Sequence, residues 1–245
     1  MIQSLERASE ILHLFEEKKF WGITQIAERV QLSKSTVFGL VSTMEKLGFL
    51  EKHPDSGKYS LGLELYRLGN MVDGDLRQMI LPELSALVDQ LGETINYVRP
   101  EGTDVIYLIK KESSHSMRIC TKNGQRYPMY ATGVGQAILA FLPEQEQRTI
   151  VSATTFSPYT SNTIVQPEQL LLKLQQIRSQ GYAVDDEGLE YGLICVAVPV
   201  FGPNSMPIAA LSCSGPKIRM TEEKIQQCVS SLKVCAQQLR DLIVQ

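Results

Sequence analysis

The stretch Ile23–Leu50, ITQIAERVQLSKSTVFGLVSTMEKLGFL, decides the fold of the N-terminal part of the chain. Its apolar residues recur every three or four positions, which gives each of two short helices one buried face. Ala27 is small where the two helices must approach closely, and Ser33 is suited to cap the free amides of the second helix. Two helices joined by a short turn place a recognition helix in the major groove of DNA in many DNA-binding proteins.

The polar run Lys34, Ser35 and Thr36 begins the second helix. In this motif the N-terminal end of the recognition helix contacts base edges and phosphates. An ordinary helical hairpin would show the same pattern, so the residues that follow are needed to distinguish the two interpretations. Residues 49–61, FLEKHPDSGKYSL, predict two short strands around a Pro-Asp-Ser-Gly turn. A helix-turn-helix followed by a hairpin is a winged helix, and its tip would bring His53 and Lys58 to the phosphate backbone.

The composition is typical of a globular protein that is not attached to a membrane. The 245 residues are enough for two domains, and there is no apolar run long enough to cross a membrane and no signal-peptide pattern. Five scattered cysteines without a CxxC pair predict reduced thiols, so we expect a cytoplasmic protein. The net charge is −3, and residues 1–62 hold 8 Lys and Arg against 8 Asp and Glu. A positive patch facing DNA must therefore come from the way the cationic side chains are placed on the surface. We expect more than one subunit on the DNA.

The rest of the chain predicts an α+β architecture. A first helix over 4–17 would complete a three-helix core, and 63–77 predicts a helix that either connects two domains or begins the second one. Beyond it the pattern predicts an antiparallel sheet flanked by helices. The expected helices cover 82–91, 134–141, 167–180 and 220 to the C-terminus. The expected strands cover 93–99, 104–111, 117–121, 182–185, 193–201 and 207–214.

Several motifs in this order resemble the IclR family of bacterial transcription regulators, over nearly the whole chain. They are LSKSTV at 32–37, LGFL at 47–50, YSLG at 59–62, ATGVGQA at 131–137, LAF at 139–141, GYAVDDE at 181–187 and LSCSGP at 211–216. The resemblance implies a winged helix-turn-helix domain (1–62), a linker helix (63–77) and an effector-binding domain of GAF-like fold (78–245). It also implies double-stranded operator DNA and a small organic acid as partners, and a homodimer that pairs into a dimer of dimers on DNA.

The chain departs from the family pattern at three places. Gln31 stands where the family often has Gly in the turn, and Gln136 stands where it usually has Lys. Phe38-Gly39 replaces a common His-Arg pair. Gly39 costs about 1 kcal/mol of helix propensity against Ala and removes a cation from the expected DNA-facing surface. Phe38 can either touch a thymine methyl or pack on the neighbouring helix, and we favour the packing.

The segment 131–144, ATGVGQAILAFLPE, has its own physical interpretation. Thr132 and Gly133 precede a helix whose first amides lack partners, and such a helix start favours a carboxylate. The alternative is that Gly133 and Gly135 only permit a tight junction between a strand and a helix. The resemblance favours a ligand site that includes Gly133 and Val134.

Further effector residues follow from the resemblance. Asp185 would point into the pocket, although an acidic run such as 185–187 is more often a solvated loop. Cys195 would face the pocket as well, although a free cysteine is usually a small buried hydrophobe. Ser212 and Ser214 alternate along a strand, so both face one side and could bind a carboxylate or satisfy backbone groups. The family layout implies apolar walls from Ile119, Tyr127, Met129 and Leu193.

No enzyme motif accompanies these residues. The sequence has no GxSxG, HExxH, P-loop or GxGxxG, and its three histidines form no recognisable site. A Cys195–His115 pair would lack a third member. We therefore expect a regulator that is not an enzyme and needs no cofactor and no metal. The alternative is a small-molecule enzyme or sensor whose N-terminal helices bind another protein.

Overall fold

The computed structural model describes residues 2–74, 76–119 and 122–243. The chain divides into two compact units, residues 1–74 and 75–245, which are considered separately. Both combine helices with an antiparallel sheet, as the α+β prediction requires. No helix in the described ranges is long and apolar enough to span a membrane.

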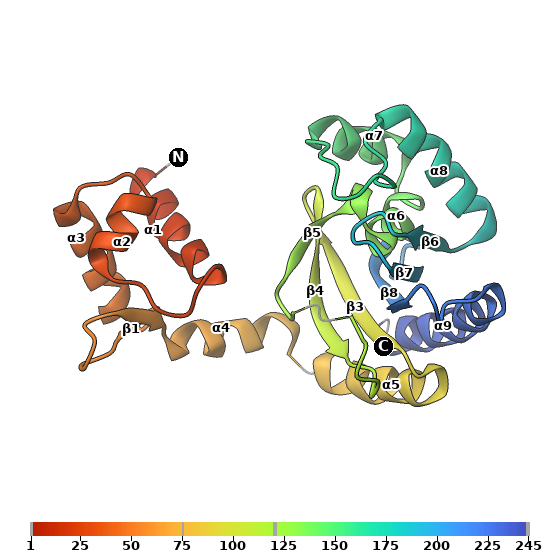
Figure 1. Cartoon of the computed structure of the whole chain (residues 1–245), viewed down its shortest axis with the longest axis horizontal. Coiled ribbons are helices and arrows are strands. Elements are labelled where there is room, and N and C mark those ends of the chain that lie inside the picture. The colour runs from red at the N-terminus through yellow and green to blue at the C-terminus, as the bar shows by residue number, and fades with distance from the viewer. Residues whose placement is uncertain (1, 75, 120–121, 244–245) are drawn as a thin grey trace. The chain divides into compact units, whose positions relative to one another are not determined.

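The N-terminal unit is a winged helix-turn-helix (Figure 1). Its elements are α1 (Gln3–His13), the 3-10 turn η1 (Leu14–Glu16), α2 (Ile23–Arg29), α3 (Lys34–Lys46), β1 (Leu50–Lys52), β2 (Tyr59–Leu61) and α4 (Leu63–Asp73). The strands β1 and β2 pair antiparallel, with Leu50 opposite Leu61, and form the predicted wing. Ile11, Ile26 and Val37 lie in one core with no exposed surface, which confirms the three-helix packing.

The C-terminal unit is built on a six-stranded antiparallel sheet of order β5-β4-β3-β8-β7-β6 (Figure 1). The strands are β3 (Thr94–Glu101), β4 (Asp104–Lys111), β5 (Arg126–Pro128), β6 (Ala183–Asp186), β7 (Leu193–Phe201) and β8 (Pro207–Pro216). The helical elements are α5 (Leu76–Leu91), η2 (Met129–Ala131), α6 (Gly133–Leu139), α7 (Glu144–Ala153), α8 (Pro167–Gln180) and α9 (Glu222–Ile243).

Alternation along the strands gives this sheet two apolar faces, each covered by helices. On one face, residues such as Ile95, Val196 and Leu211 pack under α5 and α9. On the other, Val98 and Ala197 belong to the core that α6 and α8 complete. Small residues on this second face let α6 approach β7 and β8 closely.

Several elements differ from the sequence predictions. The expected strand at 117–121 is absent over 117–119, where the segment is held by polar contacts such as the Arg118–Glu112 ion pair; the remainder lies outside the described residues. The edge strand is β5 instead, which was not predicted. The helix expected from Pro82 begins at Leu76, with Pro82 inside it.

The predicted helix over 63–77 is interrupted at Gly74, whose φ of 39° lies outside the helical region. The polar helix α7 was also missed, since only Val151 among its residues is buried. Leu5, which the pattern placed on a buried face, is 67% exposed because α1 extends past the three-helix core at its N-terminal end.

Candidate DNA-binding and effector sites

The second helix of the motif, α3, is fixed at its N-terminus by Ser33. The Thr36 amide donates a hydrogen bond to the Ser33 hydroxyl over 3.2 Å, which confirms the predicted cap. The Ser33 hydroxyl also lies 2.9 Å from that of Ser35 and 2.8 Å from that of Thr36. Val37 and Val41 are fully buried, so the rotation of the helix is set by the core. Lys34 and Ser35 are exposed and Thr36 is half-buried.

Phe38 does not pack on the neighbouring helix. Its side chain is 57% exposed, so the packing that we favoured from the sequence is wrong. The physical reason is the helical period: Val37, Val41 and Met44 already occupy the buried side of α3. Gly39 is exposed as well, and a Cβ built there would meet no atom within 4 Å.

The turn between α2 and α3 keeps a conformation that suits glycine, although glycine is absent. Gln31 has a φ of 54°, in the left-handed region that residues other than Gly, Asn and Asp rarely adopt. The departure from the family pattern at this position therefore changes the strain in the turn. The Leu32 amide donates to the Ala27 carbonyl over 3.1 Å and closes the turn.

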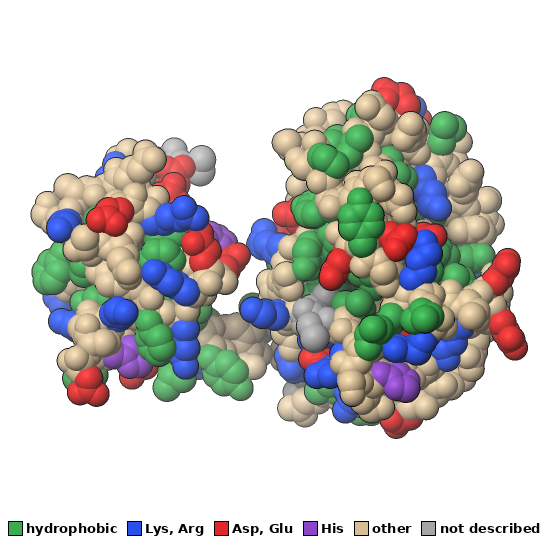
Figure 2. All heavy atoms as spheres, viewed as in Figure 1, with side chains coloured by type: hydrophobic (Ala, Val, Ile, Leu, Met, Phe, Trp, Pro, Cys, Tyr) green, Lys and Arg blue, Asp and Glu red, His purple; other side chains and the backbone are tan. Residues whose placement is uncertain are grey.

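The two residues predicted to meet the phosphate backbone at the wing have different environments. Lys58 is exposed, whereas the His53 ring is half-buried. Its Nε2 lies 2.9 Å from the Ser60 hydroxyl, and its ring packs edge-on against Phe20 with centroids 4.8 Å apart. Figure 2 shows basic and acidic side chains interspersed over the visible face of this unit, in keeping with the zero net charge of residues 1–62.

In the C-terminal unit, four strands bring polar side chains into one row on the face covered by α6. Asp185 on β6 pairs with Cys195 on β7, Cys195 pairs with Ser214 on β8, and Ser214 pairs with Thr94 on β3. Ser212 lies two residues before Ser214, on the same face as predicted. All five side chains are buried. Thr94 is far in sequence from the other four residues, and the sheet order makes it their neighbour.

Gly133 brings the start of α6 against this row. A Cβ built at Gly133 would lie 3.3 Å from the Cβ of Asp185 and 3.3 Å from the Sγ of Cys195. At Gly135 a Cβ would lie 2.3 Å from the Cα of Met129, so this glycine permits a tight junction. The amide of Gly135 donates to the hydroxyl of Thr132 over 3.1 Å and is therefore already satisfied. The tight-junction interpretation is therefore confirmed for Gly135, and the ligand site at Gly133 stays a prediction.

Burial sets the protonation of this site. Asp185 is 7% exposed, and burial raises its pKa to about 6, although its Oδ1 accepts a hydrogen bond from the Gly188 amide over 3.0 Å. Burial likewise raises the pKa of the Cys195 thiol to about 11. The Tyr107 hydroxyl faces the same groups, and burial first and the Cys195 charge second raise its pKa well above its usual range.

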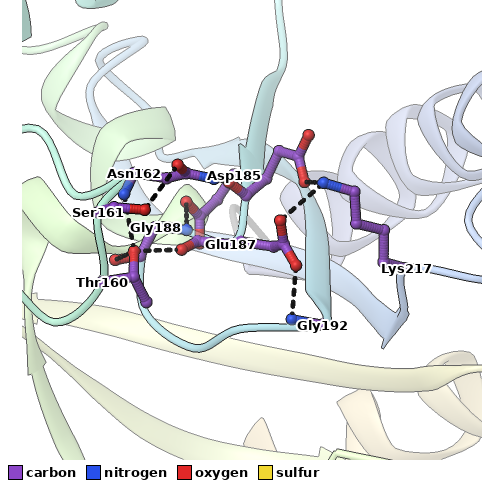
Figure 3. Close-up of polar contacts among 9 residues, drawn as sticks. Thr160, Ser161, Asn162, Asp185, Glu187, Gly188, Gly192 and Lys217 are labelled. Atoms are coloured by element: carbon purple, nitrogen blue, oxygen red, sulfur yellow. Dashed lines mark hydrogen bonds and ion pairs between the residues drawn. The ribbon is translucent and has the colours of Figure 1, made fainter.

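The acidic turn, residues 185–187, is not a freely solvated loop. Figure 3 shows it held between the loop at 160–162 and Lys217. The Thr160 hydroxyl donates to the Glu187 carbonyl over 2.6 Å, and the Lys217 ammonium lies 2.7 Å from carboxylate oxygens of both Asp186 and Glu187. Asp186 is exposed, so the solvated interpretation applies to it and is wrong for Asp185. The described residues contain no group of side chains arranged to hold a metal ion.

The other predicted effector residues differ in burial. Met129, Val134 and Leu193 are buried, and Ile119 and Tyr127 are half-buried. The sequence analysis missed Asn96, whose Nδ2 donates to the Ser212 hydroxyl over 3.1 Å and to that of Ser214 over 3.5 Å. Its signal in the sequence was an amide side chain between the apolar residues Ile95 and Tyr97. Tyr107 was missed because it alternates with other apolar residues of β4.

A second polar feature lies beside Asp185. A cavity of about 160 Å³ is lined by Gln136, Asn162, Lys173 and Asp185, among other residues. The Nε2 of Gln136 donates to the Tyr130 carbonyl over 2.8 Å, while its buried Oε1 has no partner among the described residues. The Lys173 charge lowers the pKa of Asp185 and partly opposes the effect of burial. Lys173 and Gln136 line the same cavity beside Asp185. Lys173 therefore supplies a positive charge there, although Gln136 stands where the family usually has a lysine.

Comparisons with known proteins identify the class to which these two sites belong. The model of the bacterial transcriptional regulator IclR C-terminal domain matches residues 70–241, and that of the IclR helix-turn-helix domain matches residues 4–54. The chain belongs to the IclR family of bacterial transcriptional regulators.

Individual relatives agree with this assignment. The HTH-type transcriptional regulator KdgR of Escherichia coli K12 is 35% identical over 97% of this chain and 91% of its own length. The transcriptional repressor IclR of the same organism is 31% identical over 92% of this chain and 84% of its own. The crystal structure of an IclR homologue from Microbacterium hydrocarbonoxydans, complexed with 4-hydroxybenzoate, has a TM-score of 0.84 at 24% identity. It covers 97% of this chain and 98% of its own and confirms the fold.

Proposed function

We propose that this protein is a repressor that reads a palindromic operator and responds to a small organic acid. The observation that carries the proposal is the buried row of hydroxyl, thiol and carboxyl groups under the start of α6, in a chain whose N-terminal unit is a winged helix. In this proposal residues 1–62 bind double-stranded DNA, 63–77 form the linker and 78–245 bind the acid. The E. coli relative named as a repressor supports the direction of regulation.

The DNA-binding surface would consist of the exposed N-terminal part of α3 and the wing. Lys34, Ser35, Thr36 and Phe38 would enter the major groove, and Lys58 would contact a phosphate. Because residues 1–62 have no net charge, one copy would bind DNA weakly. A homodimer, paired into a dimer of dimers on DNA, would supply the missing affinity by presenting several recognition helices to one operator.

The effector would bind where the polar row meets α6. The hydroxyls of Ser212 and Ser214 accept hydrogen bonds from Asn96 and also hydrogen-bond the Cys195 sulfur, so a carboxylate would take the place of that sulfur as their acceptor. Gly133 and Val134 would present backbone, and Ile119, Tyr127, Met129 and Leu193 would contribute apolar walls. The 4-hydroxybenzoate bound by the Microbacterium protein is an organic acid held by the same fold.

The effector would act by binding two arrangements of the dimer with different affinities. Such a difference shifts the affinity for DNA by the same coupling free energy, commonly 1–3 kcal/mol or roughly 5- to 150-fold. We further propose that the protein turns over no substrate. The Cys195 thiol, with a pKa of about 11, stays protonated near neutral pH and is a poor nucleophile. A protein that binds chromosomal DNA would also act in the cytoplasm, where that DNA is.

The test is fluorescence-anisotropy binding to the DNA upstream of the protein's own gene, at two salt concentrations, with a panel of small organic acids. We expect specific, salt-sensitive binding that one class of acid strengthens or releases. The Ser212→Ala variant should keep the DNA affinity and lose the response to the acid, whereas Ser230→Ala, on the exposed side of α9, should keep both. Absence of specific binding in every condition would contradict the proposal.

A further inference from the structure

We propose that Phe38 determines operator specificity by contacting the 5-methyl group of a thymine in the major groove. The inference rests on the DNA-binding function proposed above, and it assigns a base to a residue of this chain. Its starting point is the correction at Phe38: a large aromatic side chain stays 57% exposed on the helix that would face DNA.

The core places Phe38 on the same side of α3 as the polar start of the helix. Val37 and Val41 are fully buried and Met44 nearly so, which leaves no freedom for the helix to turn about its axis. Residues three and four positions apart share a helix face, so Phe38 lies beside Ser35 and Lys34. Both of these are exposed. A DNA duplex contacted by the Lys34 ammonium would therefore also meet the Phe38 ring.

The hydroxyl groups of the first turn are largely committed to the protein. Ser33, Ser35 and Thr36 form a cluster with oxygens 2.8 to 2.9 Å apart, and Ser33 also accepts from the Thr36 amide. One turn further, the Thr43 hydroxyl donates to the Gly39 carbonyl over 2.8 Å. Phe38, the single aromatic residue of α3, is the large side chain there without a hydrogen-bonding group. Any contact that Phe38 makes with a base must therefore be an apolar contact.

Gly39 leaves the space beside the ring open. A Cβ at this position would have no atom within 4 Å, so the space at position 39 itself is open. A long side chain at 39 would stand between the helix and the DNA, whereas glycine lets the helix approach closely. Compared with the His-Arg pair that is common in the family, the pair Phe38-Gly39 therefore makes this surface apolar and removes a cation.

Of the four bases, only thymine presents a methyl group in the major groove, and apolar side chains recognise it there. Burying one methyl group against the ring predicts an affinity gain of about fourfold for each half-site. Replacing thymidine by deoxyuridine removes this methyl and leaves the hydrogen-bonding groups of the base unchanged. The substitution thus isolates the contact that the proposal names.

The experiment uses the full-length protein and an operator selected from a random-sequence duplex library. Each thymidine is replaced in turn by deoxyuridine, symmetrically in both half-sites, and affinity is measured by fluorescence anisotropy. The expected result is one position where the replacement weakens binding by roughly 16-fold, the product of two half-sites. Phe38→Ala should bind the thymine and uracil operators equally, and Phe38→Tyr, which keeps the ring, should retain the discrimination.

Leu61→Ala is the matched control, because Leu61 is an apolar side chain of the same unit that is 48% exposed and lies on the wing. It should discriminate as the unaltered protein does. The inference is overturned if no position responds to deoxyuridine, if Phe38→Ala discriminates as strongly as the unaltered protein, or if Phe38→Ala acts only by changing the oligomeric state. Failure of the unaltered protein to select any sequence would instead overturn the proposed DNA-binding function.

Discussion

The two candidate sites are built in opposite ways. The DNA-facing surface consists of exposed side chains on one helix and one hairpin, all between residues 33 and 61. The effector row is buried and draws on β6, β7, β8 and the start of α6, with Asn96 from β3 behind the two serines. A substitution on the first surface should change recognition and leave stability nearly constant. A substitution in the second should change both, because its polar groups are part of the core.

The largest effect should come from Gly135→Ala, where α6 meets η2. The added Cβ would lie 2.3 Å from the Cα and 2.4 Å from the carbonyl oxygen of Met129, and backbone atoms cannot move aside cheaply. We expect the free energy of unfolding of the C-terminal unit to fall by about 3 kcal/mol. Thermal denaturation followed by circular dichroism measures this.

Gly39→Ala, on the exposed DNA-facing surface, is the matched control. Its Cβ meets nothing, so helix propensity alone should raise the stability of the N-terminal unit by about 0.5–1 kcal/mol. Equal effects of the two substitutions would contradict the contrast between the sites.

The second prediction concerns pH. Burial raises the pKa of Asp185 from 3.8 to about 6, so the folded protein holds a proton that the unfolded chain has lost between these values. Stability should therefore fall as pH rises from about 4 to about 6, by about 3 kcal/mol in total. Asp185→Asn keeps an oxygen for the Gly188 amide and carries no charge. It should remove this fall and be the more stable protein at pH 8.

Urea denaturation at pH 4, 6 and 8 measures the effect. Asp186→Asn is the control, since Asp186 is exposed. A pH dependence that persists unchanged in Asp185→Asn would show that Asp185 is ionised without cost in the folded protein. The same charge should weaken the binding of any carboxylate effector above pH 6, because two anions would then share the site.

The difference between the sites also explains what could be predicted from the sequence. The helix-turn-helix, the Ser33 cap and the wing follow from local periodicity and turn chemistry, so their positions were correct. Asp185, Cys195, Ser212 and Ser214 were found through family resemblance, and the structure brings them into one region. Asn96 could not be found from spacing, because its contact with Ser212 depends on the β3–β8 pairing across more than a hundred residues.

Phe38 shows the converse limit. Its neighbours were predicted correctly, but the sequence left two roles open for it, contact with DNA and packing on the neighbouring helix, and we favoured the packing. The packing fails because the buried side of α3 was already occupied by residues at the right spacing. An apolar residue that lies outside the buried face set by the helical period is therefore a candidate for contact with a partner molecule.

The third prediction separates recognition from stability. Lys34→Ala removes an exposed cation from the start of α3 and touches no core residue. We expect the logarithmic salt dependence of operator binding to fall by about one for each subunit, with the free energy of unfolding unchanged within about 0.5 kcal/mol. Anisotropy titrations over a series of salt concentrations give the slope. Lys46→Ala, at the other end of α3, should leave the slope unchanged, and a reduction there equal to that of Lys34→Ala would contradict the orientation proposed for the helix.

The smallest effect should come from the turn that joins the two helices. Gln31 holds a φ of 54°, which costs a residue with a Cβ about 1–2 kcal/mol, while glycine adopts it freely. Gln31→Gly also raises the entropy of the unfolded chain, so the net gain in stability should be about 0.5–1 kcal/mol. Gln31→Ala is the control, because alanine keeps the Cβ and the strain. A Gly variant no more stable than the Ala variant would mean that the Leu32–Ala27 hydrogen bond already offsets the strain. A more stable Gly variant with unaltered DNA affinity would show that the strain has no role in recognition.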